Sequence, residues 1–194
     1  MADQPALPAG PPAPVTDQQI RDALRQALLT VWTTESDLVS EGVNERAVIA
    51  RVALALQAAI TSWGGPWRVD VEYDRWHHPE FGVIKKALYV DGSDAADRRS
   101  VYPDLILHDP HGCFQERNLL ALEAKRGHPR RRDRDFDLAK LRAYLRELHY
   151  RQAAYLEFDG RGGPPRLQWF HLRDGQVQAA GVEDGWQQSV GRGS

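Results

Sequence analysis

Two acidic residues and a lysine lie at the ends of two apolar stretches, where charged side chains are unexpected. Asp104 lies within Val101–His108, and Glu123 and Lys125 close the stretch Asn118–Lys125. Runs of this kind are typical of strands inside a sheet, and charged groups there are costly unless something compensates them. A divalent cation shared by the two acids would do so.

The chemistry that these three side chains suit is metal-assisted hydrolysis. Mg²⁺ binds one or two carboxylates together with water and a substrate phosphate, and it lowers the pKa of the bound water. Glu123 and Lys125 are two positions apart in a strand, so both point to the same face. The ammonium group then lies near the metal-bound water, which favours hydrolysis of a phosphodiester. The alternative is structural: Asp104 opens one strand, and the other two form an ion pair at a strand end.

The two stretches resemble the signature of the PD-(D/E)XK nuclease superfamily, which has the restriction-endonuclease-like fold. The first reads Val-Tyr-Pro-Asp-Leu-Ile-Leu-His and the second Asn-Leu-Leu-Ala-Leu-Glu-Ala-Lys. The likeness extends from about Thr16 to Leu172 and is closest to small bacterial single-domain members. Asn44–Arg46 resembles the start of the first core helix, and Val69–Arg75 stands where the first core strand belongs. The patterns Asp137–Leu141 and Tyr155–Phe158 are also similar to those of the superfamily.

The resemblance implies a role for each matching residue. Asp104 and Glu123 would bind Mg²⁺ or Mn²⁺, with the carbonyl of Ala124 as a third oxygen. Lys125 would position or activate the water. Glu45 would be an auxiliary ligand, although an acid in a first helical turn is also explained by the helix dipole.

A basic stretch directly after Lys125 predicts a surface that binds phosphates without sequence preference. Its arginines, with one more on an earlier strand, are Arg126, Arg130, Arg131, Arg132, Arg134 and Arg75. The competing interpretation is a solvated loop whose charge is partly cancelled by nearby aspartates. An exposed strand face also explains Arg75 and its neighbour Glu72 without any chemistry.

The elements that would position these residues follow from the hydrophobic periodicity. Helical spacing predicts helices over 16–33, 44–62 and 136–150, the second one buried on nearly every face. Alternation or apolar runs predict strands over 67–76, 83–90, 101–108, 118–125, 153–158 and 167–172. A helix between two strands favours a parallel pair, whereas the early strands favour a meander. The expected fold class is therefore α/β, with a restriction-endonuclease-like mixed β-sheet flanked by α-helices.

Composition bounds the class of protein. The chain has 194 residues, 42% hydrophobic and 27% charged, with a net charge of −2, so any attraction to phosphate must be local. The single cysteine, Cys113, predicts neither a disulfide framework nor a thiolate zinc site.

We expect a disordered Pro-rich tail over 1–15, one nuclease-like domain over 16–176 and a poorly ordered tail over 177–194. No signal peptide or membrane span is recognisable, which predicts a cytoplasmic protein.

The leading hypothesis is a Mg²⁺-dependent nuclease that hydrolyses phosphodiester bonds of nucleic acid, with DNA favoured by the resemblance alone. One alternative is a catalytically inactive protein of the same fold that binds nucleic acid or a protein partner. A third is a subunit that is active only with a defence-system partner. A homodimer is compatible with each of them.

Overall fold

The computed structural model describes residues 14–41, 43–73, 75–78, 82–85, 87–88, 99–100, 102–111 and 117–184, and only the backbone of the four short segments between 75 and 100. The helices in these residues are α1 (Asp17–Thr34), α2 (Ser36–Ser40), α3 (Glu45–Ala59) and α4 (Arg131–Glu147), with a 3-10 turn at Thr61–Trp63. The strands of the main sheet are β1 (Arg68–Val71), β6 (Leu105–His108), β7 (Asn118–Arg126), β8 (Gln152–Phe158), β9 (Arg166–Arg173) and β10 (Gln176–Asp184). Two further pairs are β2 (Arg75–His78) with β3 (Gly82–Lys85), and β4 (Ala87–Leu88) with β5 (Arg99–Ser100).

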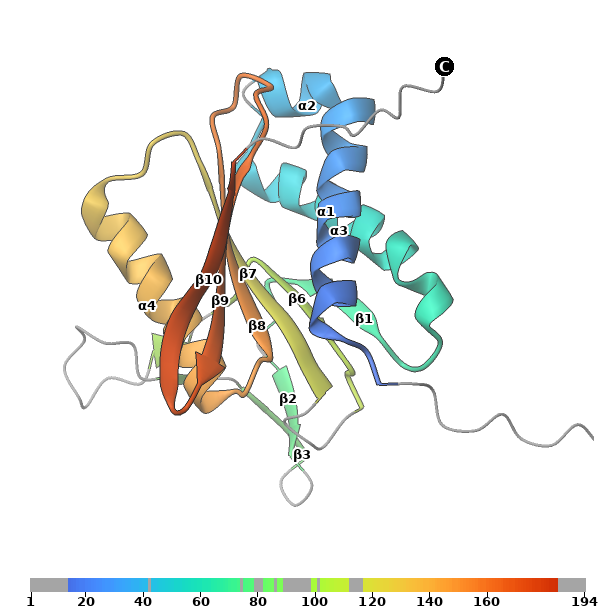
Figure 1. The fold of residues 1–194 in the computed structure, drawn as a ribbon, viewed down its shortest axis with the longest axis vertical. Helices are drawn as coiled ribbons and strands as arrows, with labels where there is room; N and C mark the ends of the chain where they lie inside the picture. The colour runs from blue at the N-terminus through green and yellow to red at the C-terminus, as the bar shows by residue number, and fades with distance from the viewer. Residues whose placement is uncertain are drawn as a thin grey trace, which may run out of the picture.

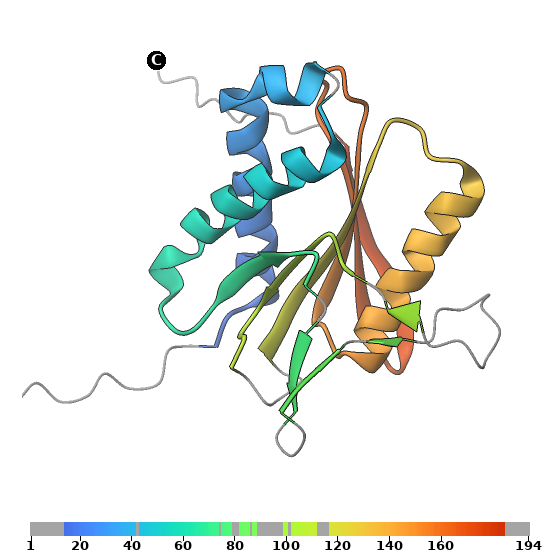
Figure 2. The same cartoon turned by 180° about the vertical axis from the view of Figure 1, so that it is seen from behind.

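The main sheet is mixed, and its order is β1-β6-β7-β8-β9-β10. β7 and β8 are parallel because α4 carries the chain back across the sheet between them, and the other neighbouring pairs are antiparallel. Figure 1 shows α1 and α3 on one face of this sheet and α4 on the other; Figure 2 shows the same layers from behind. Each layer has its own core, one between the sheet and α1–α3 and one between the sheet and α4. The predicted α/β fold with a mixed sheet flanked by helices is confirmed.

The helices on the first face begin where the sequence predicts. Thr16 caps α1 through a capping box with Gln19, and Asn44 caps α3 by accepting a hydrogen bond from the Arg46 amide. The expectation that α3 is buried on nearly every face is wrong, because Leu54 is 63% exposed. Only one stripe of this helix, which includes Val52, packs against the core.

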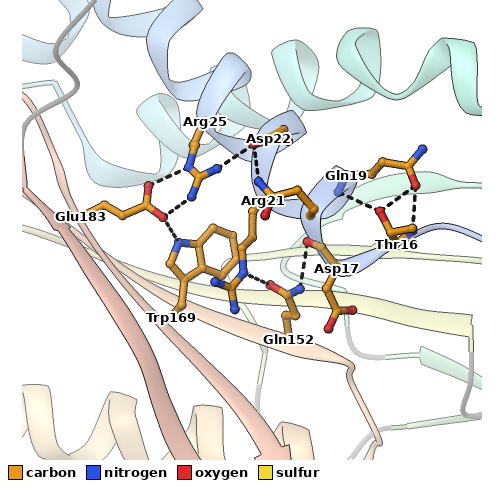
Figure 3. A network of polar contacts seen from close by, with 10 residues as sticks. Thr16, Asp17, Gln19, Arg21, Asp22, Arg25, Gln152, Trp169 and Glu183 are labelled. Carbon is orange, nitrogen blue, oxygen red and sulfur yellow. Dashed lines mark hydrogen bonds and ion pairs between the residues drawn. The ribbon is translucent and has the colours of Figure 1, made fainter.

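A polar network fixes α1 to the far strands of the sheet (Figure 3). The indole of Trp169 on β9 donates to Glu183 on β10, 2.8 Å away, and Glu183 also binds the guanidinium of Arg25 through two hydrogen bonds of 2.6 and 2.8 Å. Gln152 on β8 donates to the carbonyl of Asp17 at the start of α1. Strands and helix that are far apart in the sequence are therefore held together by charge-assisted bonds.

Several predicted boundaries are wrong. Residues 176–184, assigned mostly to the predicted tail over 177–194, form β10, whose side chains are largely exposed and therefore lack apolar alternation. The helix predicted over 136–150 begins at Arg131, since its first turn is polar and faces solvent. The strand predicted over 67–76 is interrupted after Val71, because Glu72 has a φ of +47°. The short helix α2 was not predicted.

No helix in the described part of the chain is long and apolar enough to cross a bilayer.

Candidate active site

The first pair of predicted site residues meets where β6 begins beside β7. Leu105 is paired with Leu122, so Asp104 lies just before β6 and next to Glu123. The Oδ2 atom of Asp104 accepts a hydrogen bond of 2.7 Å from the backbone N–H of Ala124. Burial raises the pKa of Asp104, and that hydrogen bond and two lysines offset only part of the increase. The structure therefore brings these two acids to one end of the β6–β7 pair.

Glu123 is completely buried and is held by two residues of α4. Its Oε2 atom lies 2.5 Å from the Nζ atom of Lys140, and its Oε1 atom accepts a hydrogen bond of 3.0 Å from the hydroxyl of Tyr144. Burial raises the pKa of Glu123 to about 8, and the charge of Asp104 adds to the increase, although Lys140 opposes it. Burial therefore disfavours the ionised form of this acid, whereas the ammonium group of Lys140 favours it.

Lys125 lies between two acids that come from different layers. Its Nζ atom is 3.6 Å from Oε1 of Glu45 on α3 and 3.5 Å from Oδ2 of Asp137 on α4. Burial alone lowers the pKa of Lys125, but the charges of Asp137, Glu45 and Asp104 outweigh it, and the pKa is raised. The ammonium group therefore stays protonated, and its side chain remains 29% exposed.

Glu45 reaches the site from the first turn of α3. Its Oε2 atom accepts a hydrogen bond of 2.8 Å from the backbone N–H of Arg126, which follows Lys125 on β7. Its two carboxylate oxygens thus contact consecutive residues of one strand. The helix-dipole explanation alone does not require these contacts, because it concerns only the position of an acid at the helix start.

The sequence pattern Asp137–Leu141 resembles the superfamily, but the sequence assigns no site role to residues of α4. Asp137, Lys140 and Tyr144 lie on one helical face, and Lys140 is also 2.9 Å from Oδ1 of Asp137. The spacing of the two charged residues is also that of an ordinary helical ion pair, whereas each of them contacts a residue of β7. Lys140 and Tyr144 follow Asp137 by three and seven positions, a spacing that places all three on one helical face. This spacing was the signal in the sequence.

Asp137 is only 4% exposed, and its Oδ2 atom accepts no hydrogen bond. The nearest cation is the ammonium group of Lys125 described above. A buried acidic oxygen without a hydrogen bond is unusual in a folded protein.

Two pockets open beside these residues. One has a volume of about 130 Å³ and is lined by Glu45, Arg46, Ile49, Val71, Glu72 and Asp104. The other has a volume of about 350 Å³ and is lined by Lys125, Arg126, Pro129, Asp133, Phe136 and Asp137. Asp104 and Lys125 are thus both reachable from a pocket, while Glu123 lies buried between the sheet and α4.

The predicted basic surface separates into two groups. Arg126 donates to the carbonyl of Val43, and Arg134 donates to Glu157 and Gln168, so these two guanidinium groups have partners inside the protein. The exposed group lies at the start of α4 and consists of Arg130, Arg131 and Arg132. Among the arginines of this surface whose side chains the structure describes, these three are the exposed ones.

The remaining candidate residues have other surroundings. Glu72 forms an ion pair with Arg46, 2.7 Å away, at the rim of the smaller pocket. His108 contacts Oδ2 of Asp70 at 2.8 Å, as expected for a hydrogen-bonded strand end. The side chain of Arg75 and the whole of Cys113 lie outside the described residues.

The donor set fits a hard divalent ion held by few protein ligands. Among the described residues no group of three or more metal-binding side chains is arranged around one point. Asp104 and Glu123 supply two carboxylates, which is a common number for Mg²⁺ with water completing its shell. The four acids and two lysines of the site, when ionised, leave a charge of −2, equal and opposite to that of one such ion. Residues Glu45, Asp104, Glu123, Lys125, Asp137 and Lys140 form this charged cluster.

No protein-family model matches the chain, and no curated protein or solved structure shows significant similarity to it.

Proposed function

We propose that this chain is a metal-dependent nuclease that hydrolyses phosphodiester bonds of nucleic acid. The observation that carries the proposal is the convergence of Asp104, Glu123 and Lys125 at one end of β7, with Lys125 held by acids from two other elements. Lys125 is 29% exposed and lines a pocket, so its ammonium group could contact a substrate.

Asp104 and Glu123 would hold Mg²⁺ or Mn²⁺, and the Ala124 carbonyl remains a predicted third ligand. A carboxylate has about four lone-pair sites, so Glu123 can bind an ion while it still accepts hydrogen bonds from Lys140 and Tyr144. The bound ion would supply an activated water and polarise the phosphate. The chain also resembles the PD-(D/E)XK superfamily in these residues, which favours DNA as the substrate.

The other side chains have separate tasks. Lys125, kept protonated by Asp137 and Glu45, would hold the attacking water and a phosphate oxygen in place. The exposed arginines at the start of α4 would bind the phosphates that flank the cleaved bond. In-line attack then needs no covalent intermediate on the protein.

A second candidate is a catalytically inactive protein of the same fold that binds nucleic acid or a protein partner. One observation favours it: Glu123 is fully buried and already neutralised by Lys140 without a metal. In such a protein the acids and lysines would be a structural cluster.

Calorimetric titration with Mn²⁺ separates the two functions. A nuclease should bind the ion in the wild type, lose binding in Asp104→Asn and keep it in the matched control Asp174→Asn, which alters an exposed acid in a turn. Purified protein incubated with single- and double-stranded DNA and RNA should then cut one of them with Mg²⁺ or Mn²⁺ and stop in EDTA. Absence of binding that depends on Asp104 would sink the nuclease proposal.

A further inference from the structure

The larger pocket beside Lys125 has walls that neither the metal nor the phosphate chemistry explains. Its volume of about 350 Å³ lies at the lower end of the range of small-molecule sites. Lys125, whose side chain is 29% exposed, is one of the residues that line it. Its apolar walls are Pro129 and Phe136.

Phe136 is a large apolar side chain that is 40% exposed and belongs to neither of the two cores. On one side its ring lies 5.8 Å from the Nζ atom of Lys140, a cation–π contact that covers the buried ion pair. The side chain of Phe136 also lines the pocket. An exposed aromatic ring next to a charged site is typical of a stacking surface.

The charges of this pocket indicate a neutral occupant. Two cations, Lys125 and Arg126, line it together with two carboxylates, Asp133 and Asp137. Asp137 is 4% exposed and faces Lys125 and Lys140, so the accessible acid is Asp133. A phosphate inside the pocket would be repelled by Asp133, whereas an uncharged ring would not. The carboxylate of Asp133 accepts hydrogen bonds and cannot donate them, so it favours a ring that carries an amino group.

Positive charge for the backbone lies next to the pocket. Arg130, Arg131 and Arg132 are exposed at the start of α4, between Pro129 and the helical turn of Phe136. Phosphates on these arginines and a base against Phe136 are compatible with one strand of nucleic acid that passes Lys125.

We propose that the pocket between Lys125 and Phe136 receives a single unstacked nucleobase that bears an exocyclic amine. This inference rests on the proposed function and narrows its substrate to nucleic acid with an unpaired nucleotide next to the cleaved phosphate. A base inside a duplex cannot enter without being unpaired, which costs a few kcal/mol. The chain therefore prefers single strands, frayed ends or flaps to continuous duplex.

The test measures binding in EDTA, so that cleavage does not interfere. Fluorescence anisotropy compares three labelled probes of about 12 units, within the usual site size of single-strand binders: oligo-dA, an abasic backbone of equal length and a blunt duplex. The wild type should bind oligo-dA about tenfold or more tighter than the abasic strand, the size expected for loss of one base–aromatic stack. Phe136→Ala and Phe136→Leu should bind both probes equally, and Phe136→Trp should retain the preference.

Two controls separate stacking from folding. Phe136→Leu keeps an apolar cover over Lys140, and its thermal unfolding should match that of the wild type. Leu172→Ala removes a similarly exposed apolar side chain from β9, far from the pocket, and should leave the preference unchanged.

Equal binding of oligo-dA and the abasic strand by the wild type overturns the nucleobase pocket and leaves the nuclease proposal standing. An undiminished preference in Phe136→Leu overturns the stacking role of the ring. Binding of none of the three probes overturns the nucleic-acid substrate, and with it the proposed function.

Discussion

The ammonium group of Lys140 and the carboxylate of Glu123 form a buried contact of 2.5 Å between α4 and β7. Lys140 is 13% exposed and Glu123 not at all, so neither group has enough water around it to be stable alone. The contact fixes the carboxylate at the position from which it would bind a metal. It also makes the state of the site sensitive to pH.

Stability should fall as the pH rises through the range in which Glu123 ionises. The folded-state pKa is about 8, above the ordinary value of 4.5, so the folded chain binds this proton more tightly than the unfolded chain. The free energy of unfolding should therefore decrease between about pH 5 and pH 8, by up to about 1.4 kcal/mol per pH unit. Urea unfolding measures the free energy of unfolding of the wild type and of Glu123→Gln across this pH range. The two proteins share all other titrating groups. Parallel plots of this free energy against pH would therefore contradict the prediction.

Removal of the Lys125 charge should separate metal binding from turnover. Because Lys125 contacts Asp137 and Glu45 rather than Glu123, Lys125→Met should keep Mn²⁺ affinity within a few-fold. Cleavage should fall by about 100-fold or more, since a preorganised donor at the reacting phosphate is lost. Calorimetry and single-turnover cleavage measure the two effects. Cleavage at the wild-type rate would remove Lys125 from the mechanism.

Substitution of an exposed arginine in the basic stretch should weaken nucleic-acid binding, whereas substitution of a partly buried one should lower stability. Arg131 has a side chain that is 96% exposed, so Arg131→Ala should weaken binding to all sequences and lower the slope of log affinity against log salt by about one. Arg142→Ala, an exposed arginine further along the same helix, is the matched control. Salt titrations of oligonucleotide binding report the slope.

Arg134→Ala should act on stability instead, because Arg134 binds Glu157 and Gln168 and lies over the ring of Tyr155. We expect a loss of about 1 kcal/mol in the free energy of unfolding, the usual size for such partly exposed bonds. A change in the salt slope equal to that of Arg131→Ala would show that the side chain contacts phosphate after all.

The network of Figure 3 gives a prediction on the opposite side of the sheet. Hydrogen bonds from Arg25 lower the pKa of Glu183, so its contribution is present above about pH 4.5 and is lost as the pH falls below it. Glu183→Gln should lower the free energy of unfolding by about 1 kcal/mol at pH 7, after allowance for partial exposure, and by less at pH 3. Chemical unfolding at both values checks this. An equal loss at the two pH values would show that charge is not the cause.

The sequence predicts the elements that are periodic and misses those that depend on tertiary position. The apolar runs around Asp104 and Glu123 mark two buried strands, because burial on both faces requires continuous apolar residues. β10 has no such pattern, since its residues are held by pairing with β9 rather than by burial.

The roles of Asp137 and Lys140 could not be read from their spacing for a related reason. A separation of three positions on a helix is equally suitable for a surface ion pair. Their contacts with Lys125 and Glu123 exist because α4 crosses back over β7 to reach the parallel strand β8. Which residues of α4 face β7 depends on how the whole sheet is assembled, so local spacing cannot reveal it.

Because α4 crosses back over β7, most residues of the candidate site come from one continuous segment of the chain. Every member of its charged cluster except Glu45 comes from the continuous segment 104–140, which runs through β6, β7 and the first turns of α4. The far strands β9 and β10 contribute no member of it. A transplant of this segment together with the start of α3 would thus carry the whole charged cluster.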